Sequence, residues 1–149
     1  MRERKVFYVV INGKCLHSFP EWVQSRVNLA LECKLNDVTK WCLEEFVDHN
    51  SYEKCVFKAW YLTDTSLISL CLSLNQIHVI EYFKKYIIKI ETVMDVIEDE
   101  YTDKEIACFY SFKIKFVDGD VIKLDKPKLK RADYKNLYID FVEAFRQSL

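Results

Sequence analysis

Glycine and proline are scarce in this chain, whose 149 residues contain two of each. Such a composition excludes a low-complexity linker rich in these residues. It also leaves no glycine-rich loop for a phosphate, and neither Gly-x-Gly-x-x-Gly nor Gly-x-Ser-x-Gly occurs in the sequence. We therefore expect a protein that is not an enzyme and that carries no cofactor.

A net charge and a long hydrophobic run are also lacking. The 22 basic residues are balanced by 23 acidic ones, so the chain lacks the overall positive field of a typical nucleic-acid-binding protein. No apolar run approaches the roughly 18 residues that a membrane-spanning helix needs. The basic residues at positions 2, 4 and 5 precede an apolar stretch that is too short for a signal peptide. We expect a cytoplasmic protein with no integral membrane segment.

Closely spaced cysteine pairs are absent as well. The six cysteines are scattered and none forms a Cys-x-x-Cys motif, which argues against a zinc ribbon or a thioredoxin-like site. Cys42 and Cys71 lie within apolar stretches and are expected to behave as small buried hydrophobic residues. Free thiols in a reducing compartment are the favoured interpretation, and a disulfide framework is the alternative.

Hydrophobic residues, by contrast, make up 50% of the chain, enough for one domain with a sizeable core. The Asn12-Gly13 pair predicts a short hairpin over Val6 to Leu16, because both residues tolerate positive φ. Ser18 and Glu21 form a capping box that predicts a helix to about Lys34.

A second helix is predicted to begin near Asn36 or Asp37, either of which can cap it. Its expected apolar stripe consists of Val38, Trp41, Cys42 and Phe46. From Lys54 onward the pattern changes to that of strands, separated by short polar turns and by an acidic loop at 97–104. The predicted strands are Cys55 to Leu62, Leu67 to Leu74, Ile77 to Phe83, Tyr86 to Val96 in one or two pieces, and Ile106 to Val117 with a return arm after Gly119.

The last predicted element is an amphipathic helix that starts near Ala132 or Asp133. Its apolar residues recur at spacings of four, three and four, which places them on one face of a helix. These residues are Tyr134, Tyr138, Phe141 and Phe145. Such a face must pack against a sheet or a groove.

The stretch FKIKFVDGDVIKL, at 112–124, predicts a hairpin whose register follows from its hydrophobic pattern. A three-residue loop over 117–119 places Ile122 opposite Ile114 on the buried face and gives Gly119 a left-handed conformation. The same register places Lys113 opposite Lys123 on the outer face, an unfavourable like-charge pair.

Two explanations account for this lysine pair. Acidic side chains close in sequence, at 98–100 and 103, could neutralise the lysines; alternatively, the face could bind an anion. The candidate anion-binding residues are Lys113, Lys115, Lys123, Lys128, Lys130 and Arg131.

Three segments resemble bacterial pleckstrin-homology-like domains. They are WYLTDTSLISL at 60–70, IEYFKKYIIKIETV at 80–93, and the 112–124 hairpin together with the final helix. The resemblance covers roughly residues 55–149 and implies a bent antiparallel barrel plugged by the C-terminal helix. Domains of this family are binding modules for lipid headgroups, for peptides or for self-association. In composition the chain is similar to small proteins of Bacillus-like bacteria and their phages.

We therefore predict a single α+β domain over 1–149. Residues 1–54 would contribute the β-hairpin and two helices, and residues 55–149 a strongly bent antiparallel sheet or partly open barrel with a C-terminal capping helix. The expected function is non-catalytic binding to a protein partner or to a second copy, with exposed aromatics such as Tyr52, Tyr101 or Tyr110 as anchors. The alternative is recognition of an anionic ligand, a lipid headgroup or a nucleic acid, by the lysine-rich hairpin.

Overall fold

The computed structural model describes residues 10–11, 14–15, 19–32, 34–49, 51, 54–73, 75–127 and 132–149. The protein is α+β, with helices α1 (Glu21–Leu31) and α2 (Ala132–Gln147) and short 3₁₀ turns η1 (Leu35–Asp37) and η3 (Lys84–Tyr86). Its strands are β1 (Val10–Ile11), β2 (Lys14–Cys15), β3 (Lys40–Val47), β4 (Val56–Leu62), β5 (Ser66–Leu72), β6 (Ile77–Phe83), β7 (Ile87–Glu98), β8 (Glu105–Phe116) and β9 (Val121–Asp125).

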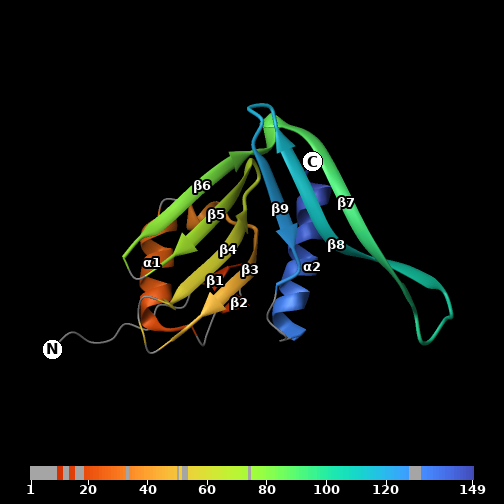
Figure 1. Ribbon diagram of the computed structural model, residues 1–149, viewed down its shortest axis with the longest axis horizontal. Coiled ribbons are helices and arrows are strands. Elements are labelled where there is room, and N and C mark those ends of the chain that lie inside the picture. The colour runs from red at the N-terminus through yellow and green to blue at the C-terminus, as the bar shows by residue number, and fades with distance from the viewer. Residues whose placement is uncertain are drawn as a thin grey trace.

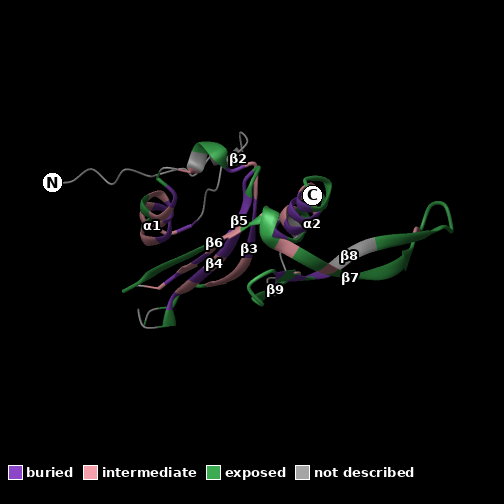
Figure 2. Ribbon diagram, turned by 90° about the horizontal axis from the view of Figure 1, so that it is seen from above, coloured by how far each residue is buried: buried purple, intermediate pink, exposed green. Residues whose placement is uncertain are grey.

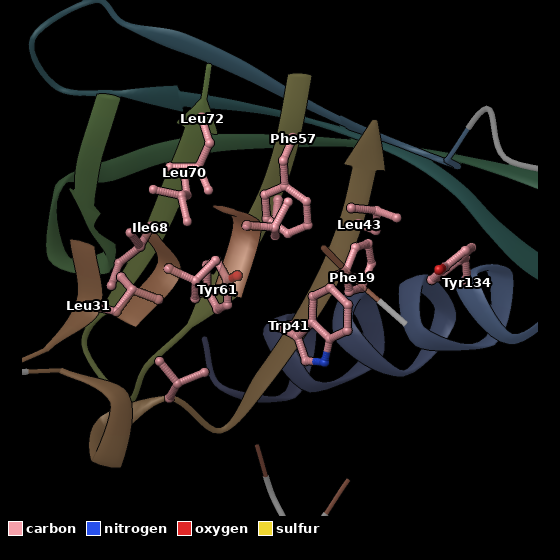
Figure 3. Close-up of a cluster of buried hydrophobic side chains, with 14 residues drawn as sticks. Phe19, Leu31, Trp41, Leu43, Phe57, Tyr61, Ile68, Leu70, Leu72 and Tyr134 are labelled. Carbon is pink, nitrogen blue, oxygen red and sulfur yellow. The ribbon is translucent and has the colours of Figure 1, made fainter. Parts of the chain in front are cut away.

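Strands β3 to β6 form an antiparallel sheet in chain order, and α1 covers one of its faces (Figure 1). Val23, Val27 and Leu31 of α1 are buried there. The sheet contributes alternate residues to the same core: Phe57, Ala59 and Tyr61 from β4 and Ile68, Leu70 and Leu72 from β5 (Figure 3). Phe19 joins them with its ring edge-on to Phe57, at a centroid distance of 5.3 Å.

The predicted second helix is wrong, because residues 40–47 form strand β3. This strand pairs with β4 from Lys40 opposite Leu62 to Val47 opposite Val56, with an irregularity between Leu43 and Glu45. Trp41, Cys42 and Leu43 are buried in succession. Consecutive buried residues remove the alternation that normally marks a strand. The spacing of Val38, Trp41, Cys42 and Phe46 matches a helical period instead.

The other face of this sheet packs on a second antiparallel sheet, of order β7-β8-β9, and on α2. Trp60 and Leu67 from the first sheet meet Phe112, Ile114 and other residues of the second in one buried cluster. The predicted face of α2 completes this cluster with Tyr138, Phe141 and Phe145, and Tyr134 reaches the α1 side. The described strands form separate sheets, so the sheet does not close into a barrel.

The predicted hairpin register is confirmed. Ile114 lies opposite Ile122, and Lys113 lies opposite Lys123. The Phe116 amide donates to the Asp120 carbonyl at 2.9 Å, which leaves 117–119 as a three-residue loop, and Gly119 has a φ of 94°. A single glycine with positive φ therefore sets which residues of β9 face the core.

At the N-terminus, β1 and β2 pair as an antiparallel hairpin, with Val10 opposite Cys15. The rest of the predicted Val6 to Leu16 hairpin, including Asn12-Gly13, lies outside the described residues, as does the Ser18 cap. Cys42 is buried, as expected, whereas Cys71 is only half-buried. Both are free thiols.

The Phe141 side chain is expected to be essential for stability, because it is 0% exposed at the junction of α2 with both sheets. Phe141→Ala should lower the free energy of unfolding by about 3–5 kcal/mol, measured by urea denaturation. Glu143→Ala, at an exposed site on the same helix, should change it by no more than about 0.5 kcal/mol. Equal effects of the two substitutions would contradict the placement of α2.

Candidate protein-interaction surface

Strands β7 and β8 extend together beyond the body of the protein as a two-stranded ribbon (Figure 1). β9 pairs only with Ser111 to Lys115 of β8, so the outer part of β8 has β7 as its one neighbour among the described strands. We call residues 93–106 the ribbon. Glu98 is still paired with Glu105, so β7 extends two residues into the acidic segment that was predicted to be a loop.

The ribbon is largely exposed (Figure 2). Its exposed residues include apolar side chains on both faces. Thr92 lies opposite the buried Phe112, so its alternate neighbours Met94 and Val96 continue the core-facing side outward. Val96 is 64% exposed there because no described element covers this part of the sheet. On the opposite face Ile97 lies across from Ile106, and both are exposed.

The tip of the ribbon is acidic and ordered by its own hydrogen bonds. Residues 93–106 contain six carboxylates and one lysine, which gives a net charge of −5. The Asp99 carboxylate accepts hydrogen bonds from the Tyr101 amide at 3.0 Å and from the Thr102 hydroxyl at 3.1 Å. Tyr101, predicted as an anchor, is 94% exposed at this tip. The side chains of Tyr52 and Tyr110 lie outside the described residues.

The predicted lysine face is the outer face of the second sheet. Lys113, Lys115 and Lys123 are all exposed on it and lie on adjacent strands. Lys128, Lys130 and Arg131 lie outside the described residues. The structure thus brings three of the six predicted residues together.

Two carboxylates whose positions were not predicted lie beside these lysines. Glu91 of β7 sits directly opposite Lys113, and Asp125 is 3.4 Å from the Lys123 ammonium. Glu91 also pairs with Lys89 at 3.1 Å. A hydrogen bond from Lys89, with the charges of Lys89 and Lys113, lowers the pKa of the Glu91 carboxyl. The acidic residues at 98–100 and 103, one of the two explanations for the lysine pair, lie at the ribbon tip instead.

A histidine and a cysteine side chain have structural contacts in the described part of the chain. Within the described ranges, no group of three or more histidine, cysteine or acidic side chains is arranged to hold a metal ion. His49 and Cys55 stabilise the turn after β3: His49 Nδ1 accepts the Ser51 amide at 2.9 Å, and the Cys55 thiol donates to the His49 carbonyl at 3.2 Å. Burial and nearby Glu44 raise the pKa of the Cys42 thiol well above its ordinary value. Because the thiolate is the nucleophilic form, the raised pKa leaves the Cys42 thiol unactivated.

Comparison with protein-family models, with curated proteins and with solved structures gives no match to this chain. No helix in the described part of the chain is both long enough and apolar enough to cross a bilayer. The surfaces above therefore stand as the basis for a functional assignment.

A pH titration of Glu91 followed by NMR should give a pKa below the ordinary value of about 4.3. The depressed folded-state pKa contributes stability that is present above the unfolded value and is lost as the pH falls through the folded value. Lys89→Gln should raise the Glu91 pKa more than Lys113→Gln, because Lys89 also supplies a hydrogen bond. Lys104→Gln is the control and should leave it unchanged; equal shifts from all three variants would refute this electrostatic account.

Proposed function

We propose that this protein is a non-catalytic module that binds another protein or a second copy of itself, and that the ribbon is its contact surface. The observation that carries the proposal is the exposure of apolar side chains on both faces of the ribbon. Exposed apolar groups grouped on one projecting element are typical of interaction sites rather than of solvated surface. One edge of β7 pairs with none of the described strands, so its main-chain groups can pair with another strand.

We further propose that the module is pleckstrin-homology-like. Support comes from the order of the elements: a four-stranded antiparallel sheet, a three-stranded antiparallel sheet and a C-terminal helix packed between them. On this proposal the module begins with β3, at Lys40, and not at residue 55. Fold resemblance alone does not identify a ligand, so the binding surface is argued from the ribbon.

A photo-crosslinking amino acid at position 96 tests the binding function in the native cytoplasm. We expect protein adducts from this position, because Val96 lies on the uncovered side of the ribbon. Position 29 is the matched control, since Leu29 is equally exposed, at 66%, but lies on α1. The proposal would be contradicted if adducts were no more abundant from position 96 than from position 29.

Anion recognition is the second candidate function. It is favoured by one observation, the gathering of Lys113, Lys115 and Lys123 on one exposed face. The shared chemistry would be a phosphate-bearing ligand, from either a lipid headgroup or a nucleic acid. Glu91 and Asp125 weaken the positive field of this face, which is why we rank the function second.

Binding to phosphatidylserine-containing vesicles and to a short DNA duplex, in separate assays, tests this second function. Binding that weakens with salt and is lost in the Lys113→Glu/Lys123→Glu variant is the expected result. Lys135→Glu, on the exposed face of α2, is the matched control and should bind normally. Absence of binding by the unmodified protein in both assays would eliminate anion recognition.

A further inference from the structure

We propose that the occupant of the ribbon is a second copy of this chain, bound through antiparallel pairing of the two β7 edges about a two-fold axis at Thr92. This inference rests on the proposed function and names its partner. β7 is an edge strand of the described sheet, and residues 91–98 along it are all exposed. A two-fold arrangement requires a surface that complements itself, and β7 meets that requirement in its charge, its shape and its register.

The second sheet is acidic at one end and basic at the other. The ribbon has a net charge of −5, whereas lysines gather around the start of β7, at positions 84, 85 and 89. If two copies paired with their β7 strands parallel, the acidic ends would lie together and so would the basic ends. An antiparallel arrangement places the acidic tip of each copy beside the lysines of the other, which favours association with a second copy in this one orientation.

A hollow at the start of β7 provides the matching shape. It has a volume of about 520 Å³, and its lining includes the apolar Ile88, Ile90 and Leu149 and the basic Lys84, Lys85 and Lys89. This mixture of apolar and basic groups complements the ribbon, which carries Met94 and Val96 flanked by carboxylates. The hollow can therefore receive the uncovered side chains of the second copy, and each copy contributes one hollow and one ribbon.

The register follows from the positions of the charges on β7. With Thr92 opposite Thr92, Lys89 of one copy faces Asp95 of the other, and Ile90 faces Met94 of the other. A shift to an axis at Val93 would place Glu91 opposite Asp95, and an axis at Glu91 or at Asp95 would place a carboxylate opposite itself. An axis at Met94 would place the half-buried Ile90 opposite Glu98. Opposite-charge and apolar pairs across strands are favourable, so the Thr92 register is selected.

The substitutions Lys89→Glu and Asp95→Lys test this pairing by sedimentation of the full chain. Their side chains are 63% and 51% exposed, so the fold should tolerate both changes. The unmodified protein should dimerise in the micromolar range. Each single variant places like charges at two symmetric contacts and should weaken dimerisation by about tenfold or more.

Rescue distinguishes this arrangement from a nonspecific charge effect. The Lys89→Glu/Asp95→Lys double variant should dimerise again, and an equimolar mixture of the two single variants should form heterodimers. Lys126→Ala is the matched control, because it removes the 3.9 Å contact of Lys126 with Asp95 within one chain and leaves β7 unchanged; it should dimerise like the unmodified protein.

A monomeric unmodified protein, single variants that dimerise normally, or failure of both rescues would overturn the dimer. Such a result accompanied by position-96 adducts to a different protein would end the dimer and leave the proposed binding function standing. The same result without any position-96 adduct would end both.

Discussion

The structure depends on one constraint: the four-stranded sheet is apolar on both faces and must be covered twice. In β4 the neighbouring residues Trp60 and Tyr61 are both buried but belong to different cores. One face is buried by α1, and the other by α2 together with β8 and β9. Without either cover a row of large side chains would be left in water, at a cost of about 1.5–3 kcal/mol for each.

The sequence predicted elements whose signals are local and failed where burial is decided over long range. The loop at Gly119 and the register of Ile114 with Ile122 were predictable, because turn chemistry and alternation agreed. The α2 face was predictable from its helical spacing. Strand β3 was not, because burial on both faces places Trp41, Cys42 and Leu43 in the core without alternation. Only its pairing with β4 makes this segment a strand.

The candidate site was only partly predictable, because it too depends on contacts between distant parts of the chain. The hairpin pattern placed Lys113 beside Lys123, but the carboxylate beside Lys113 comes from β7, whose register with β8 includes two irregularities that no local signal indicates. The ribbon was missed because Met94 and Val96 look, in sequence, like ordinary buried strand residues. Whether a helix or a third strand covers such residues depends on the lengths of β9 and α2, elements that begin more than twenty residues later in the chain.

The short length of β9 also divides β8 into two parts with different dynamics. Ser111 to Lys115 is held by strands on both sides and packs on α2, so its backbone amides should open only when the core itself unfolds. Beyond Ser111, the ribbon has one ladder of hydrogen bonds and solvent on both faces, and it can fray independently of the core. The protein thus combines a body that unfolds cooperatively with a ribbon whose twist can adjust to a binding partner.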